Sequence, residues 1–96
     1  MMVVVAYDVN TQDSGGARRL RQVAKTCQKY GQRVQNSVFE CLVTPADYVV
    51  LQDKLLKIMN QEKDCLRFYQ LGSNYSHRIH SYGRQRSFDL EGTIMI

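Results

Sequence analysis

Close to its start the chain reads Met2-Val3-Val4-Val5-Ala6-Tyr7-Asp8-Val9, an apolar run with a single charge, Asp8. A run this rich in β-branched residues is typical of a strand that is buried within a sheet. The stretch therefore predicts a central first strand over residues 2–9. A carboxylate that ends a buried strand is costly unless it is hydrogen-bonded, paired or bound to a metal. Asp8 is accordingly either a turn residue of the following loop or a functional group.

The next part of the chain predicts a polar loop, a helix and then extended structure. Residues 10–16 are polar and end in two glycines. Residues 17–30 carry apolar side chains at spacings of three and four, which indicates an amphipathic helix. Gly31 is expected to end this helix as a C-cap glycine. Residues 32–43 are expected to be extended, either as one kinked strand or as two short strands that meet at Asn36-Ser37.

The second half of the chain predicts another helix and at least one more strand. Thr44 is a good N-cap, and Pro45 sits at the first helical position, where a missing N–H costs nothing. This helix is expected to run to about Met59. Residues 65–71 alternate between apolar and polar side chains, which is typical of a strand. Residues 87–96 are expected to add a final strand after an irregular segment.

This order of elements in 96 residues predicts one domain, residues 1–96, of the α+β class. It fits a ferredoxin-like split βαβ fold, with both helices on one face of an antiparallel sheet and a C-terminal strand extension. A chain of this size buries only about 60–65% of the surface that it exposes when unfolded. The other sheet face would stay uncovered, so we expect a second copy to cover it in a homodimer.

Composition limits the kind of partner and compartment. Thirteen Lys and Arg against nine Asp and Glu give a net charge of +4, which favours an anionic partner such as nucleic acid. The three cysteines form no C-x-x-C pair, which disfavours a zinc ribbon or a thioredoxin-type redox motif. The apolar N-terminal run is too short for a signal peptide or a membrane span, so we expect a cytoplasmic protein without a membrane partner.

Basic residues gather on the polar side of the first predicted helix. Arg18, Arg21, Lys25 and Lys29 follow this side, and Arg19 lies near the loop. Like charges four residues apart cost roughly 0.2–0.5 kcal/mol per contact in an isolated helix. A solvated face usually mixes signs, so this pattern leaves two alternatives open: a solvated basic face or a contact with a phosphate backbone.

A second basic stretch, residues 65–88, contains no acid. It combines arginines and histidines with aromatic residues, as nucleic-acid-binding surfaces do; they are Arg67, Arg78, Arg84, Arg86, His77, His80, Phe68, Tyr69, Tyr75 and Tyr82. The alternative is an interface segment whose arginines pair with acids of another chain. The two histidines are spaced like zinc ligands, but no second ligand pair accompanies them.

The sequence resembles the small CRISPR-associated adaptation nucleases, the second of the two core proteins of spacer acquisition. The resemblance spans essentially the whole chain and its length. Tyr7-Asp8 ends the first strand, Tyr30-Gly31 ends the first helix, and the string Arg33-Val34-Gln35-Asn36-Ser37-Val38-Phe39-Glu40 follows. The last string, at this distance from Tyr7-Asp8, is the specific part of the pattern. Gly15-Gly16 and residues 84–90 look most like the variants of type I-C systems.

The resemblance implies a ferredoxin-like homodimer that cleaves RNA or double-stranded DNA with the help of a metal and binds the CRISPR-associated integrase subunit. Asp8 would then be the catalytic residue and the ligand of Mg²⁺, with Mn²⁺ as an alternative. Five other residues are expected to bind DNA, and RNA if that is the substrate: Arg18, Arg19, Arg21, Arg33 and Phe39.

Two classes of function stay open at this point. The first is a phosphodiesterase that uses a metal at paired Asp8 residues. The second is a non-catalytic scaffold that holds DNA and bridges the integrase subunits. Both need a basic surface and a dimer, so the sequence does not choose between them.

Overall fold

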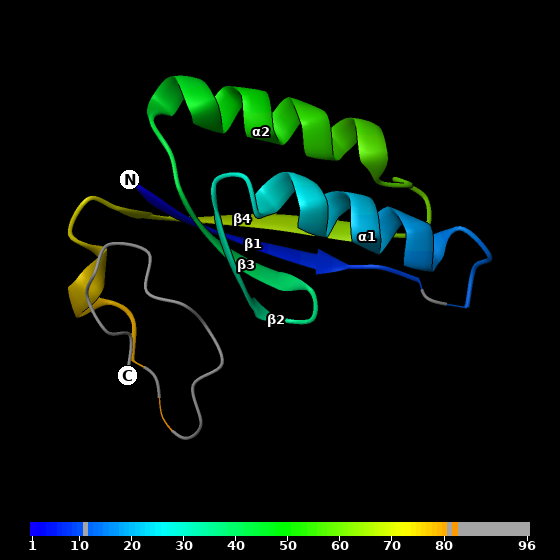
Figure 1. Ribbon diagram of the computed structural model, residues 1–96, viewed down its shortest axis with the longest axis horizontal. Helices are drawn as coiled ribbons and strands as arrows, with labels where there is room; N and C mark the ends of the chain where they lie inside the picture. The colour runs from blue at the N-terminus through cyan, green and yellow to red at the C-terminus, as the bar shows by residue number, and fades with distance from the viewer. Residues whose placement is uncertain (11, 81, 83–96) are drawn as a thin grey trace.

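The structure, a computed structural model, describes residues 1–10, 12–80 and 82. It shows an antiparallel sheet with two helices packed on one of its faces (Figure 1). The elements follow one another as β1 (Met2–Asp8), α1 (Gly16–Cys27), β2 (Gly31–Gln35), β3 (Val38–Leu42), α2 (Pro45–Ile58), β4 (Cys65–Gly72) and the short 3₁₀ helix η1 (Tyr75–His77). The expected ferredoxin-like α+β arrangement is confirmed.

β1 lies inside the sheet, as its valine-rich sequence predicts. The strand order is β2-β3-β1-β4, so β1 is hydrogen-bonded on both sides and both of its neighbours run antiparallel to it. Side chains alternate between the two faces of a strand. Val3, Val5 and Tyr7 therefore point toward the helices and are at most 1% exposed. Asp8 belongs to the opposite set and is exposed.

The core lies between the helices and the sheet. β3 faces β1 in register, with Val3 opposite Cys41 and Val5 opposite Phe39, so these residues share the helix-covered face. Helix side chains fill the space above them, chiefly Leu20, Val23, Ala24 and Cys27 from α1 and Tyr48, Leu51 and Leu55 from α2. From β4, Phe68 packs edge-on against Tyr48, with 5.8 Å between the ring centres.

Residues 31–42 form two strands joined by a turn, which resolves the alternative that the sequence left open. β2 and β3 pair antiparallel with an irregularity between Arg33 and Gln35. The predicted role of Gly31 was wrong: α1 already ends at Cys27, and Gly31 is the first residue of β2. A Cβ at Gly31 would lie 1.8 Å from the Glu40 carbonyl oxygen, so the glycine is needed for the close approach of the two strands.

The start of α2 follows the sequence signal closely. Thr44 is extended and its hydroxyl accepts a hydrogen bond of 3.1 Å from the backbone N–H of Asp47. Pro45 occupies the first helical turn. This cap fixes the direction in which α2 leaves β3, and α2 then lies beside α1 over the sheet (Figure 1).

No helix of the described residues covers the second face of the sheet, which we call the open face. Along its middle it carries Val4 and Ala6 of β1 beside Val38 and Leu42 of β3. Gln32 and Glu40 face each other across β2 and β3 on the same side. Both are largely buried, and burial raises the pKa of the Glu40 carboxyl.

The end of the chain bears on two of the sequence predictions. The strand expected at residues 87–96 lies outside the described residues, as do Arg84 and Arg86. Over the described part of the chain, no helix is long and apolar enough to cross a membrane.

Candidate active site

A pocket of about 390 Å³ opens on the open face, at the end of the sheet where β1 finishes and β4 begins. Its volume is within the range of small-ligand sites in proteins. Three strands and the β2–β3 turn line it, through Ala6, Tyr7, Asp8, Ser37, Val38, Cys65, Arg67 and Tyr69. An acid, an arginine and three hydroxyl-bearing residues therefore line one shallow cavity together with Ala6 and Val38.

Asp8 is placed in this pocket by the alternation of β1. Its Cα pairs with that of Cys65 on β4, and on the other side the N–H of Tyr7 donates to the Ser37 carbonyl oxygen at 2.9 Å. The backbone on both sides of the carboxylate is thus fixed by pairing. Among the described residues that line the pocket, Asp8 is the one carboxylate, and it is exposed rather than buried.

The donor set of the pocket suits a hydrated magnesium ion only in part. Among the described residues there is no group of three or more His, Cys, Asp or Glu side chains that could hold a metal. Magnesium usually keeps several waters and is bound through one or two carboxylates together with substrate phosphates. Asp8 fits as one such ligand, and the remaining positions would have to come from water, substrate or a second copy of the chain.

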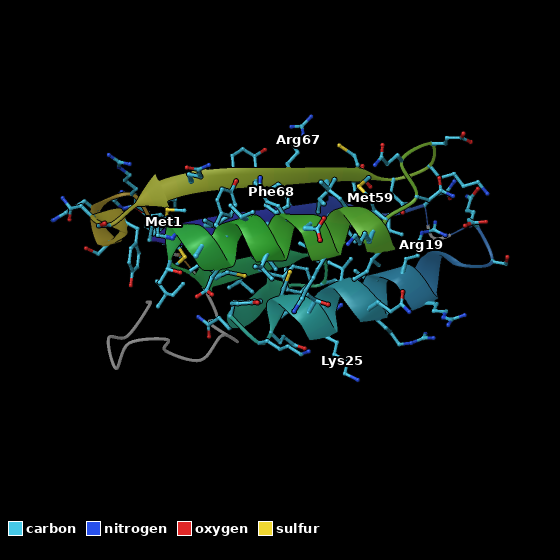
Figure 2. The ribbon with its side chains drawn as sticks, turned by 90° about the horizontal axis from the view of Figure 1, so that it is seen from above. Met1, Arg19, Lys25, Met59, Arg67 and Phe68 are labelled. Atoms are coloured by element: carbon cyan, nitrogen blue, oxygen red, sulfur yellow. The ribbon has the colours of Figure 1, made fainter. Side chains whose placement is uncertain are left out.

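Arg19 has a different environment from the one expected of a nucleic-acid contact. Its Nε and Nη2 donate to the two carboxylate oxygens of Asp64, at 2.8 and 3.1 Å, and its Nη1 donates to Asp13 at 2.7 Å. The Arg19 side chain is only 14% exposed, and that of Asp64 is completely buried. Figure 2 shows Arg19 at the end of α1, beside the loops that carry these acids.

Asp64 accepts further hydrogen bonds in addition to those from Arg19. Its carboxylate also accepts from the Tyr7 hydroxyl at 2.5 Å and from the backbone N–H groups of Asn10 and Asn60. Burial by itself would raise the pKa of Asp64, but Arg19, Tyr7 and the two N–H donors offset this and hold that pKa well below its usual range. Burial, with Asp64 acting in the same direction, raises the pKa of Tyr7 to about 12.

This network joins four parts of the chain directly behind Asp8. Tyr7 precedes Asp8 in β1, Asn10 follows it, Arg19 belongs to α1, and Asp64 lies just before β4. No pattern in the sequence indicates that Tyr7 and Asp64 form a hydrogen bond. An isolated acid directly before a strand was the available signal, but 57 positions separate it from its tyrosine partner.

Arg33 and Phe39 lie on the helix-covered face of the sheet, opposite to the pocket. Phe39 is fully buried, so a direct contact between this ring and nucleic acid does not fit the structure. The Arg33 guanidinium stands 5.6 Å from the centre of the Phe39 ring, and its Nε donates to the Asn36 carbonyl oxygen at 2.7 Å. The Arg33 guanidinium therefore forms a cation–π interaction with the buried Phe39 ring.

The remaining predicted contacts, Arg18 and Arg21, are exposed on α1. Lys25 and Lys29 are exposed as well, and within the described residues none of these four side chains forms a salt bridge. Figure 2 shows Lys25 projecting from α1 on the side of the molecule opposite to Arg67. The structure thus brings only Asp8 of the predicted residues into the pocket and leaves Arg18 and Arg21 on a basic surface of α1. Arg19 belongs to the Asp64 network, and Arg33 lies over Phe39 on the helix-covered face.

Comparison with known proteins gives the family. The family model described as "CRISPR associated protein Cas2" matches residues 1–79. The chain belongs to the Cas2 family. This agrees with the resemblance that residues 7–8 and 33–40 carry.

Individual Cas2 proteins are similar over the full length. The chain is 56% identical to the "CRISPR-associated endoribonuclease Cas2" of Chlorobaculum tepidum over 96 residues, which cover all of both chains. It is 48% identical to the "CRISPR-associated endonuclease Cas2" of Halalkalibacterium halodurans over 95 residues, 99% of each chain. The crystal structure of Streptococcus pyogenes Cas2 at pH 6.5 superposes with a TM-score of 0.79 and 54% identity, over 86% of this chain and 100% of that one.

The Asp64 network predicts how stability depends on pH. Replacing Asp64 by Asn should lower the free energy of unfolding at pH 7 by about 3–5 kcal/mol, because Arg19 loses the charge that compensates it. The pKa of Asp64 is lower in the folded chain than in the unfolded chain. Its contribution is therefore present above about pH 4 and is lost as the pH falls further. Urea unfolding of both proteins between about pH 2 and 7 measures this difference.

Asp53 gives the matched control for this measurement. It forms an ion pair with Lys57 on the surface of α2, and both side chains are more than half exposed. Asp53→Asn should change the free energy of unfolding by less than about 0.5 kcal/mol. If Asp64→Asn and Asp53→Asn lower the free energy of unfolding equally, the Asp64 network does not stabilise the fold as predicted.

Proposed function

We propose that this protein is a metal-dependent endonuclease of CRISPR spacer acquisition, which hydrolyses phosphodiester bonds of RNA or double-stranded DNA in the cytoplasm. The observation that carries the proposal is the pocket that holds Asp8 beside Arg67, Ser37 and Tyr69. Relatives at 48–56% identity are named as CRISPR-associated endonucleases or endoribonucleases. Membership of the Cas2 family supports a role in CRISPR spacer acquisition. The pocket supports hydrolysis of a phosphodiester bond.

The reaction that suits this pocket is hydrolysis. A water molecule adds to phosphorus, the bond from phosphorus to one ester oxygen breaks, and the two ends leave as a phosphomonoester and an alcohol. Mg²⁺ or Mn²⁺, when bound, would polarise a phosphate oxygen and lower the pKa of a bound water. Asp8 would hold the ion at a fixed place because the neighbouring strands fix its backbone. The network of Asp64, Tyr7 and Arg19 keeps the end of β1 rigid.

The proposed enzyme is a homodimer joined through the open faces of two sheets. The apolar side chains Val4, Ala6, Val38 and Leu42 lie on a face that no described element covers. Within the described residues, the Gln32 amide and one Glu40 carboxylate oxygen are buried without a hydrogen-bond partner. Buried polar atoms of this kind are uncommon in a finished protein. A second copy packed on the apolar part of this face would bring a second Asp8 to the same interface.

A scaffold function is the second candidate, and the position of the basic residues favours it. Arg18, Arg21 and Lys25 lie on α1, which packs on the sheet face opposite to the Asp8 pocket. This surface can hold DNA while the protein bridges subunits of the CRISPR integrase, with no part taken by Asp8. The two candidates are separated by the dependence of each activity on Asp8.

The first prediction of the proposed function is that Asp8→Asn abolishes cleavage but not binding. A metal contributes several kcal/mol of charge stabilisation, and each 1.4 kcal/mol is a tenfold change in rate. Cleavage should therefore fall at least about 100-fold, whereas the affinity for the same RNA and duplex DNA should stay within about threefold. EDTA should abolish cleavage by the wild type, and Mg²⁺ or Mn²⁺ should restore it.

Two outcomes would decide against the enzyme. Cleavage that persists in Asp8→Asn or in EDTA would contradict a metal held by Asp8. Integration of spacers by an Asp8→Asn protein that no longer cleaves would place the scaffold function first.

The second prediction concerns the dimer. Analytical ultracentrifugation at micromolar concentration should give twice the mass of the 11.1 kDa chain. Val4→Lys places a charge in the middle of the open face and should shift the sedimenting species to the monomer, because a buried unpaired charge is costly. Val49→Lys is the control, since Val49 is 64% exposed on the outer side of α2. A monomeric wild type would refute the dimer.

The third prediction concerns the basic surface on α1. The affinity for nucleic acid should fall as salt rises, because contacts with phosphate release bound counterions. Replacing Arg18 and Arg21 together by Ala should weaken binding and reduce the slope of log K against log salt by about 1.4–1.8, which is two phosphate contacts. The control replaces Lys54 and Lys57 of α2. If both double variants lose the same affinity, the binding surface is not on α1.

A further inference from the structure

We propose that Arg67 binds the phosphate at which the chain is cut, and that it completes with Asp8 a two-point site for one phosphodiester group. This inference rests on the proposed function of Asp8 and adds to it the residue that positions the substrate. Arg67 lies in β4, outside the basic helix and outside the pattern of residues 33–40 that marks the family resemblance.

The pairing of β1 with β4 places the two groups side by side. Ala6 is opposite Arg67 and Asp8 is opposite Cys65, so Arg67 is the diagonal neighbour of Asp8 across the strands. Diagonal neighbours on one face are about 7–8 Å apart, within reach of a long side chain. Phe68, the next residue in β4, points to the helices and packs against Tyr48, which leaves Arg67 on the open face. Figure 2 shows Arg67 projecting away from both helices.

Within the part of the chain that the structure describes, no acid pairs with the charge of Arg67. Arg19 is bound to Asp13 and Asp64, and Arg33 and Arg78 donate to backbone carbonyl oxygens. Among the described residues, Arg67 has no carboxylate within salt-bridge distance; its side chain lies 3.5 Å from the Tyr69 hydroxyl and also interacts with the Cys65 thiol. Of the described residues that line the pocket, Arg67 is also the one cation. Its donors are therefore available to an anion that enters beside Asp8.

Asp8 and Arg67 can serve one phosphate with its cation, because they lie on the same face of neighbouring strands and line the same pocket. A salt bridge between the two side chains would close the pocket, and none is present in the described part of the chain. A metal on the Asp8 side and a guanidinium on the Arg67 side can contact different oxygens of the same phosphate. The planar guanidinium fork binds two such oxygens at once and opposes the negative charge that grows during hydrolysis.

Tyr69 and Ser37 complete the surroundings of this phosphate. The Tyr69 hydroxyl lies 3.5 Å from the Arg67 guanidinium, and Tyr69 is 46% exposed beside it. Ser37 approaches from the β2–β3 turn on the other side of Asp8. Arg67 is thus the residue that contacts substrate, and Tyr69 is a positioning residue that acts through it.

The first experiment measures cleavage. Arg67→Ala should lower kcat about 100-fold, as the loss of one preorganised donor to a developing negative charge does. Arg67→Lys should recover only part of the rate, because a point charge replaces a two-pronged donor. Lys54→Ala removes the same charge from exposed α2 and should leave kcat unchanged. A kcat for Arg67→Ala equal to that of Lys54→Ala would overturn the inference.

The second experiment does not depend on cleavage and uses a cysteine of the chain as the reporter. Cys65 lines the pocket and is exposed, whereas Cys27 and Cys41 are buried. In EDTA, where nothing is cut, a bound RNA or DNA oligonucleotide should slow the reaction of Cys65 with a maleimide at least tenfold. Arg67→Ala should remove most of this protection, and Lys54→Ala should retain it. Mass spectrometry of the modified peptide measures the rate at Cys65.

The outcomes separate this inference from the proposed function. Protection that is the same in Arg67→Ala and wild type would overturn the inference while leaving an Asp8-dependent nuclease intact. A Cys65 that does not react in the unbound protein would also overturn it, because the pocket would then be closed, for instance by a second copy whose acid pairs with Arg67. If the oligonucleotide protects Cys65 only when Arg67 is present, but the protein cleaves no RNA or DNA, Arg67 would be supported as a phosphate-binding residue. The proposed nuclease function would then be refuted.

Discussion

The buried carboxylate of Asp64 is the interaction on which the rest of this structure depends. It accepts hydrogen bonds from Arg19, Tyr7 and two backbone N–H groups, and it has no contact with solvent. A buried charge with fewer partners would be strongly destabilising. The partners come from the end of β1, the loop after it, the first turns of α1 and the turn before β4. One side chain thus joins the end of β1, the loop after it, α1 and the turn before β4.

The two residues that end β1 show how one strand serves both stability and chemistry. Tyr7 points toward the helices and anchors Asp64, whereas Asp8 points to the open face and enters the pocket. The alternation of a strand forces adjacent residues onto opposite faces, so the rigid network lies directly behind the reactive group. This explains in physical terms why a tyrosine next to an aspartate is useful at this position. The polar network holds the strand end, and the exposed carboxylate remains available to bind a metal.

The basic residues of the chain have separate tasks. Arg19 is held within the network, Arg33 stacks over a buried ring, and the exposed arginines of α1 form a surface on the far side of the sheet from Asp8. Arg67 is left as the cation of the pocket. A count of positive charges cannot distinguish these roles, because each depends on which acid or backbone oxygen lies within reach. The division also explains how binding of a long nucleic acid and cleavage at one phosphate can be carried by different faces.

The sequence by itself determined the ferredoxin-like order of elements and singled out Asp8 as a candidate, because hydrophobic periodicity, the Thr44–Pro45 cap and the end of a valine-rich strand are local signals. It assigned Gly31 to a helix cap, because a glycine after a helical pattern looks the same whether a left-handed turn or a close strand requires it. The family resemblance implied a nucleic-acid contact for Phe39, but the neighbouring strands set the face to which this ring points, and it lies in the core. Only the tertiary structure decided that Tyr7, Arg19 and Asp64 meet, and that Arg67 shares a pocket with Asp8. These contacts join positions more than forty residues apart, and strand register, which no local pattern specifies, brings them together.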